Sequence, residues 1–218
     1  MTDLPGAGAP VDLALVLAFD GSGSVTFDEF GLMTRGVGEA LRDPATQAGM
    51  VGGMHQACFC AVLLWSGHEQ QQVMVPWTRI TGHASLDAFA GLVEDMPRDM
   101  RPGTTAIGNA LLACEALLAD LPATAGRRVI DVAGDGRSND GVPPGPVRDR
   151  LVAAGVTING LCVLHTEADL IASYTSEVIG GVGSFALQCQ DYAGFAEAMQ
   201  QKLTREVAGI ATVSSSRG

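Results

Sequence analysis

Residues 11–25 read VDLALVLAFDGSGSV, and this stretch decides the fold. Residues 11–19 form a largely apolar run that is too short for a buried helix. A run of this length is typical of a strand whose two faces are both covered by helices. It ends at Asp20, where a loop rich in glycine and serine begins. Residues 27–41 then predict a helix, because apolar side chains recur there at helical spacing.

Strands and helices alternate along the rest of the chain. Further strands are predicted at residues 57–65, 72–76, 128–133, 156–164 and 184–188. Further helices are predicted at residues 86–96, 106–118, 146–154, 169–177 and 193–207. The strand at 72–76 is more polar and is closed by Pro76, which places it near an edge. The alternation predicts an α/β fold with a doubly wound, mainly parallel sheet, one antiparallel edge strand and helices on both faces.

Length and composition fit one packed domain. The chain has 218 residues, of which 47% are hydrophobic and 17% charged, so disorder is excluded for most of it. We predict a domain at residues 11–208, with a flexible N-terminus at 1–10 and a disordered tail at 209–218. The formal net charge of −11 repels phosphate backbones and argues against nucleic acid as a partner. The same field attracts divalent cations.

The sequence predicts no membrane span, since no apolar run reaches the length that a bilayer requires. The first ten residues also lack the basic start and apolar core of a signal peptide. We expect a cytoplasmic protein, or a periplasmic or secreted one if a leader has been removed. The five cysteines lie mostly in apolar segments, and we expect buried free thiols.

Three short segments place polar side chains in loops. They are Asp20-Gly21-Ser22-Gly23-Ser24, Gly103-Thr104-Thr105 and Gly134-Asp135-Gly136. Taken singly, they are explained by a flexible turn, a helix N-cap and a tight turn. Two of them directly follow predicted parallel strands, at the sheet edge where ligands of such folds bind.

Together, the three segments resemble the metal-ion-dependent adhesion site of von Willebrand factor A-type (VWA) domains. The resemblance assigns the metal to Asp20, Ser22, Ser24, Thr105 and Asp135. Thr105 is preferred to Thr104 because the family's ligand threonine stands five residues before an alanine, here Ala110. Thr104 occupies a position that is usually glycine, and Gly21 one that usually holds a larger residue.

The resemblance extends to a bacterial family of VWA proteins of uncharacterised function. It runs from about residue 13 to residue 207 and includes the segments VPWT, RRVIDVAGDG and GVTINGL. It implies the VWA fold and the metal site. It implies no biochemical activity.

The chemistry of the site can be stated from its residue types. Hydroxyl oxygens and carboxylates suit Mg²⁺ or Mn²⁺, which prefer hard oxygen ligands. If Asp20 and Asp135 act mainly through waters and hydroxyls, the cation keeps its charge and an open position. A partner protein presenting an Asp or Glu would then complete the coordination. The motif supplies no nucleophile with a base, so we expect no enzyme activity.

Two alternatives stay open. The first is a haloacid dehalogenase-like phosphatase, because Asp20 and residues 134–140 are similar to its motifs. That chemistry needs a second aspartate where Ser22 stands, and a basic residue between the motifs, whereas the only lysine is Lys202. The second alternative is a metal-free scaffold. We interpret Asp140 as a turn residue, Arg127 and Arg128 as a solvated turn, and the four histidines as surface or loop residues.

Overall fold

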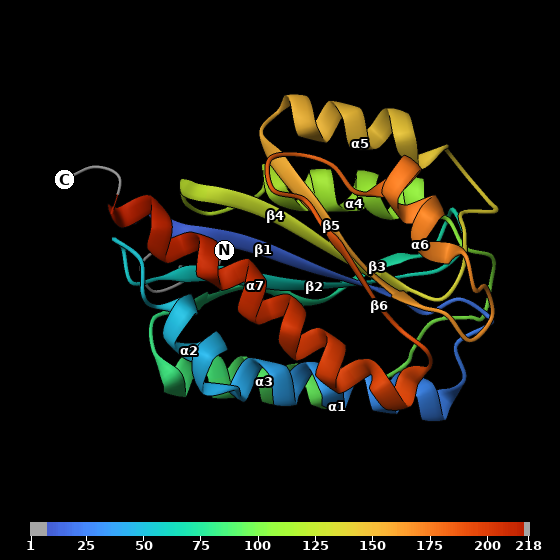
Figure 1. Ribbon diagram of the computed structural model, residues 1–218, viewed down its shortest axis with the longest axis horizontal. Helices are drawn as coiled ribbons and strands as arrows, with labels where there is room; N and C mark the ends of the chain where they lie inside the picture. Colours follow the sequence, from blue (N-terminus) through green and yellow to red (C-terminus); the bar gives the residue numbers. More distant parts are fainter. Residues whose placement is uncertain (1–7, 216–218) are drawn as a thin grey trace.

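The computed structural model describes residues 8–215. Within this range, helices lie on both faces of one central sheet (Figure 1). Within this range the sheet has six strands, in the order β3-β2-β1-β4-β5-β6. The strands are β1 (Val11–Asp20), β2 (Cys58–Trp65), β3 (Gln71–Ile80), β4 (Ala125–Gly134), β5 (Val156–Val163) and β6 (Ala186–Cys189). The helices are α1 (Phe27–Arg42), α2 (Pro44–Met50), α3 (His83–Glu94), α4 (Ile107–Ala119), α5 (Pro144–Ala153), α6 (Leu170–Ser173), the π-helical turn η1 (Tyr174–Val178), the 3₁₀ turn η2 (Tyr192–Gly194) and α7 (Phe195–Ser215).

Strand directions confirm the predicted fold class. β1 pairs in parallel with β2 and β4, β4 pairs in parallel with β5, and β5 with β6. Only the pairing of β3 with β2 is antiparallel among the described strands. β1 lies at the centre because its apolar residues can be buried on both faces.

Two hydrophobic cores lie on opposite faces of the sheet. Successive side chains of a strand point to opposite faces, so Leu15 and Leu17 enter one core and Val16 and Ala18 the other. Helices α1, α2, α3 and α7 cover the first face, and α4, α5 and α6 cover the second (Figure 1). All five cysteines are buried and free, as predicted.

β3 is longer than the sequence predicted. The prediction that the strand ends at Pro76 is wrong, because β3 continues to Ile80. Its register against β2 shifts between Cys60 and Val62, and Pro76 falls within this irregular stretch. An edge strand with a bulge tolerates a residue that has no N–H to donate.

Two helical segments also differ from the prediction. α2 was not predicted, although Asp43 caps it by accepting hydrogen bonds from the N–H groups of Ala45 at 2.9 Å and Thr46 at 3.1 Å. The single helix predicted at 169–177 is α6 followed by the π-helical turn η1. Both segments are short, so periodicity is a weak signal for them.

The closing helix is also longer than predicted, since α7 continues to Ser215 instead of ending at residue 207. Residues 1–7 and 216–218, for which flexibility was predicted, lie outside the described residues. Within residues 8–215, the helices lack the length and apolar character that a membrane span requires.

Candidate metal site

The fold brings the three predicted segments together at one end of the sheet. β1 and β4 are neighbours, and their register pairs Phe19 with Ala133. Asp20 and Asp135 therefore follow adjacent strands at the same carboxyl edge. The loop before α4 joins them, because the N–H of Gly23 donates to the carbonyl oxygen of Gly103 at 2.9 Å.

The loop after β1 is closely held. The N–H of Ser22 donates to Oδ1 of Asp20 at 2.7 Å, and the N–H of Gly21 donates to the carbonyl oxygen of Trp65 at 2.7 Å. A Cβ on Gly21 would lie 3.1 Å from a methyl carbon of Leu64. Glycine therefore fits the space at this position, where the resemblance leads one to expect a larger residue.

A chain of hydroxyl groups connects this loop to Asp135. The Oγ atoms of Ser22 and Ser24 are 3.1 Å apart, and the hydroxyl of Ser24 donates to Oδ1 of Asp135 at 2.7 Å. Thr26 begins α1 immediately afterwards with a capping box, in which its N–H donates to Glu29 at 2.8 Å. The helix start thus fixes where the serine loop ends.

The backbone of Thr105 is pinned by Asn139. The N–H of Thr105 donates to Oδ1 of Asn139, and the N–H of Asn139 donates to the carbonyl oxygen of Thr105, both at 2.9 Å. Thr105, Ser22 and Ser24 line one hollow of about 400 Å³. The neighbouring hydroxyl of Thr104 is engaged elsewhere, since it donates to Asp140 at 2.6 Å.

The predicted site residues form two layers. The three hydroxyl residues line the hollow, while Asp20 and Asp135 lie beneath it with no exposed surface. Ser22 and Thr105 are also buried, at 1% and 5% exposed, whereas Ser24 is exposed. Asp20 and Asp135 stand where buried strands end, so neighbouring loops cover them.

Burial sets the electrostatics of the two carboxyl groups. Burial, together with the charge of Asp135, raises the pKa of Asp20 to about 7, although hydrogen bonds from Ser22 oppose the change. Burial also raises the pKa of Asp135, against hydrogen bonding from Ser24. The Oδ2 atoms of both residues are buried without a hydrogen-bond partner among the described groups.

These residues fit a divalent cation. Two unpartnered carboxylate oxygens in the interior are costly unless a positive charge compensates them. Three hydroxyl oxygens beside them add hard donors of the kind that Mg²⁺ and Mn²⁺ prefer. Within residues 8–215, no group of three or more His, Cys, Asp or Glu side chains is placed to bind a metal, so a hydroxyl-rich set is the candidate.

Two residues at the site were not predicted. Nε2 of His165 lies 3.6 Å from Oδ2 of Asp135 and 3.8 Å from Oε1 of Glu29. Arg98 donates from its guanidinium to the carbonyl oxygen of Ser22 at 3.1 Å. The position of His165 just after β5, at the carboxyl edge, was an available signal. Arg98 lies in a loop after α3 that carries no recognisable motif.

The rim of the hollow carries charged side chains. Arg137 pairs with Glu167 at 2.8 Å and with Asp169 at 2.5 Å. Asp140, interpreted from sequence as a plain turn residue, instead accepts hydrogen bonds from Thr104 and from the N–H of His68 at 2.9 Å. The loops after β2 and β4 are therefore tied to each other beside Thr105.

A model of the family described as "Protein of unknown function (DUF1194)" matches residues 10–211. The chain belongs to the DUF1194 family. A search of curated proteins finds no match to this sequence.

Solved structures show which fold this DUF1194 chain has. It is similar to proximal thread matrix protein 1 from the mussel byssus with a zinc-occupied MIDAS motif, with a TM-score of 0.65, 22% identity, and coverage of 92% of this chain and 49% of that chain. It is similar to a von Willebrand factor type A protein from Catenulispora acidiphila, with a TM-score of 0.60 and 17% identity. This match covers 90% of this chain and 43% of that chain. It is also similar to the vWF domain of the type V pili tip protein Mfa5 from Porphyromonas gingivalis, with a TM-score of 0.60 and 11% identity. This match covers 92% of this chain and 96% of that chain.

At these identities the likeness establishes the fold, which is that of a VWA domain. The DUF1194 chain spans about half the length of the mussel protein. The predicted recognition of a VWA domain from an uncharacterised family is confirmed.

Proposed function

We propose that this DUF1194 protein is a metal-dependent protein-binding domain that captures an acidic side chain of a partner. Ser22, Ser24 and Thr105 would hold Mg²⁺ or Mn²⁺, with Asp20 and Asp135 beneath them. The observation that supports this most directly is the convergence of these residues around one hollow, with two carboxylate oxygens left unpartnered. A cation bound there would supply a coordination position to an incoming carboxylate.

The residues of the chain have separate tasks in this proposal. The hydrogen bond from Ser24 to Asp135 orients the serine oxygen toward the hollow. The pairing of Thr105 with Asn139 fixes the threonine backbone. Since the protein carries a net charge of −11, a local positive charge is needed before an acidic partner can approach closely.

The phosphatase alternative receives little support. The residue two positions after Asp20 is Ser22, whose hydroxyl faces Ser24 and offers no general acid. The only lysine, Lys202, is buried and paired with Asp131. Arg137, the arginine that lines the hollow, is paired with two acidic residues.

The metal-free scaffold alternative must account for two buried carboxyl groups without a bound cation. It would leave Asp20 and Asp135 buried close to each other, with His165, 3.6 Å from Oδ2 of Asp135, as the nearby group that can carry a positive charge. The raised pKa values of both groups show that the interior disfavours their ionised forms. A bound cation would compensate both carboxylates, and this supports the metal-dependent proposal.

A pull-down tests the proposal. The tagged chain is incubated with native cell lysate in Mg²⁺, in EDTA, and in Mg²⁺ as the Thr105→Ala variant. Thr175→Ala, which changes an exposed threonine on another part of the surface, is the matched control. We expect proteins that are recovered by the wild type and the control in Mg²⁺ and lost in the other two conditions. Recovery of the same proteins in all conditions would favour the metal-free scaffold.

A further inference from the structure

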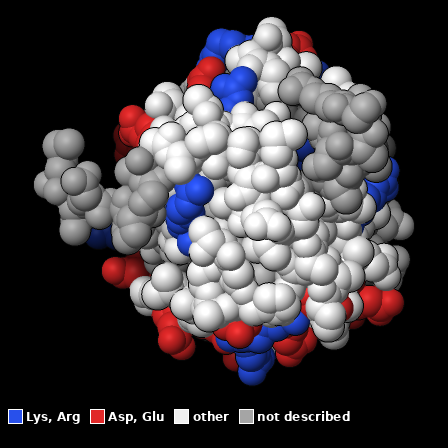
Figure 2. Space-filling model, turned by 90° about the vertical axis from the view of Figure 1, so that its left-hand side faces the viewer, with Lys and Arg blue, Asp and Glu red and all other residues white. Residues whose placement is uncertain are grey.

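A second hollow lies at the opposite end of the sheet from the metal site. It has a volume of about 450 Å³ and is lined by the first residues of β4 and β5, the loop before β6, and α7. β4 spans the distance between the two ends, so the hollows are about 25 Å apart at the rise of an extended strand. Figure 2 views the molecule from this end, where uncharged residues fill the centre and acidic side chains stand mainly toward the margins.

The floor of this hollow is a closed polar network. Glu206, which is 1% exposed, accepts a hydrogen bond from Arg127 on one carboxylate oxygen and from Asn159 on the other. Arg127 also donates to the backbone carbonyl oxygen of Glu206 at 2.9 Å, and Asn159 accepts from the N–H of Phe185 at 2.9 Å. The prediction that Arg127 and Arg128 lie in a solvated turn is therefore wrong, because both are part of β4. The single acidic group of the lining is already neutralised.

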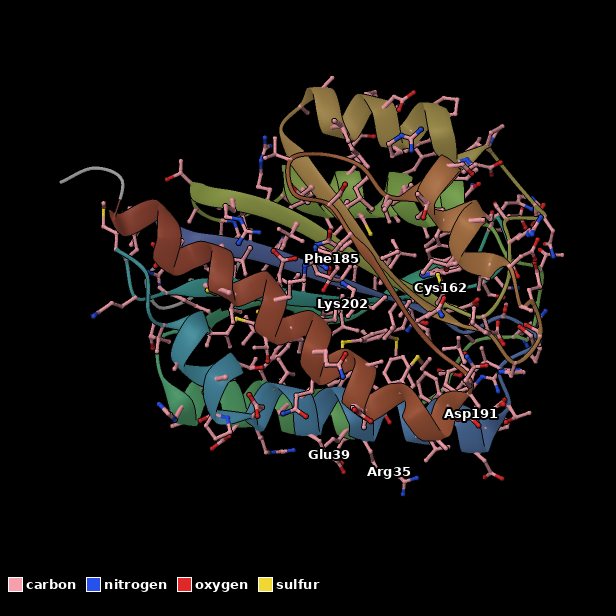
Figure 3. All side chains as sticks on the ribbon, in the orientation of Figure 1. Arg35, Glu39, Cys162, Phe185, Asp191 and Lys202 are labelled. Carbon is pink, nitrogen blue, oxygen red and sulfur yellow. The ribbon has the colours of Figure 1, made fainter. Side chains whose placement is uncertain are left out.

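One wall of the hollow is an aromatic ring that contacts two cations. The guanidinium carbon of Arg205 lies 4.0 Å from the centre of the Phe185 ring, and Nζ of Lys202 lies 5.5 Å from it. Lys202 and Phe185 are seen close together beside β6 in Figure 3. Lys202 is occupied by Asp131 in the interior. The stacking holds the Arg205 guanidinium in place while its N–H groups stay available.

Two guanidinium groups at this hollow, those of Arg128 and Arg205, are not paired with an acidic side chain of the described residues. Ion pairs found among these residues involve Arg42, Arg127, Arg137, Arg148 and Arg150, and not these two arginines. Arg128 donates to the backbone carbonyl oxygen of Ala154, which does not neutralise it. Because Arg127 and Glu206 cancel, these two arginines make the hollow positive in a chain whose net charge is −11.

We propose that this hollow is a binding site for a small organic anion that carries phosphate or carboxylate groups. The planar donors of Arg128 and Arg205 match oxyanions in shape and charge. The volume falls in the range of small-molecule pockets and exceeds what a single inorganic ion fills. Val182, which is 96% exposed, offers apolar contact for the rest of the ligand.

The test titrates the full chain with inorganic phosphate and, separately, with citrate, and follows backbone amide signals by NMR. Chloride at matched ionic strength serves as the reference. The protein is first stripped of metal with EDTA and then dialysed into buffer without chelator, because EDTA is itself a polycarboxylate. The outcome is then independent of the metal site. We expect saturable shifts at Gly155 and Gly183, which line the hollow, and none at Gly136 beside Asp135. The stronger of the two probes identifies the preferred oxyanion.

Variants decide whether the arginines are responsible. Arg205→Gln and Arg128→Gln should each weaken binding by about tenfold, as expected for loss of a charge-assisted hydrogen bond. Arg35→Gln, on the exposed side of α1, is the matched control and should bind like the wild type. Absence of saturable shifts in the wild type, or equal affinity in all three variants, would overturn the proposal.

Discussion

The hydroxyl of Thr104 donates to Oδ2 of Asp140 at 2.6 Å. The same carboxylate accepts from the N–H of His68 at 2.9 Å and lies 2.8 Å from its Nδ1. These hydrogen bonds hold the pKa of Asp140 well below its ordinary value, so the carboxylate stays ionised. Both threonines line the hollow, but the hydroxyl of Thr104 is engaged by the loop after β4, which favours Thr105 as the proposed metal ligand.

Substitution of the two adjacent threonines should separate their roles. Thr105→Val should lower Mn²⁺ affinity by at least about tenfold, because a ligand oxygen is lost. Thr104→Val should change it roughly threefold or less, since its hydroxyl only ties two loops together. Isothermal titration calorimetry measures both. If Thr104→Val lost more Mn²⁺ affinity than Thr105→Val, the metal ligand would be Thr104 and not Thr105.

Asp20→Asn should weaken metal binding and should increase the stability of the metal-free protein. In EDTA, the variant should be more stable than the wild type at pH 8, because it removes a buried charge that has an unpartnered oxygen. With Mn²⁺, the wild type should gain thermal stability and the variant should not. Melting curves with and without the metal provide the measurement. If the variant were stabilised by Mn²⁺ as strongly as the wild type, Asp20 would not belong to the metal site.

The raised pKa of Asp20 also predicts a pH dependence for the metal-free protein. The folded value of about 7 exceeds the ordinary value of 3.8, so between these the folded state binds the extra proton. Stability from this group is therefore greatest at low pH and falls as the pH rises toward 7, by a few kcal/mol at most, on the order of 1.4 kcal/mol per pKa unit. Denaturation in EDTA at pH 5 and pH 8 should show this loss in the wild type relative to Asp20→Asn. Parallel pH profiles would contradict it.

Arg98 should act as a positioning residue for the serine loop. Loss of its hydrogen bond to the carbonyl oxygen of Ser22 in Arg98→Met should reduce Mn²⁺ affinity roughly three- to tenfold. Arg101→Met removes an exposed arginine from the same loop and is the control. Equal affinities in the two variants would show that the loop holds its shape without Arg98.

The buried pair of Lys202 and Asp131 should matter for stability. Lys202→Met leaves the Asp131 carboxylate uncompensated in the core and should cost about 3–5 kcal/mol of unfolding free energy. The double variant with Asp131→Leu should recover most of this loss, because no lone charge remains. Urea denaturation of both variants is the measurement. An unchanged midpoint in Lys202→Met would show that the pair contributes little.

The phosphatase alternative predicts turnover, whereas the metal-dependent binding that we propose does not. We expect no hydrolysis of a generic phosphate ester in Mg²⁺ by the wild type. Hydrolysis that is lost in Asp20→Asn would instead identify Asp20 as a nucleophile.

Local patterns were sufficient for the order of most elements and for the prediction that three polar segments meet at one end of the sheet. The apolar run before Asp20 is long enough only for a strand buried on both faces, and this places the loop after it at the carboxyl edge of the sheet. Segments without a strong period were predicted less well. α2 and the end of β3 depend on an aspartate cap and on a bulge against β2.

By itself, the sequence determined the fold class and which side chains gather at one end of the sheet, because strand ends and loop motifs are adjacent along the chain. Only the tertiary structure decided that Asp20 and Asp135 are buried, that Thr104 is bound by Asp140, and that Arg128 and Arg205 share a hollow. Each of these depends on packing between segments far apart in the chain. Burial and hydrogen bonding at these contacts depend on how the helices and loops pack against the sheet, so the local sequence pattern does not predict them.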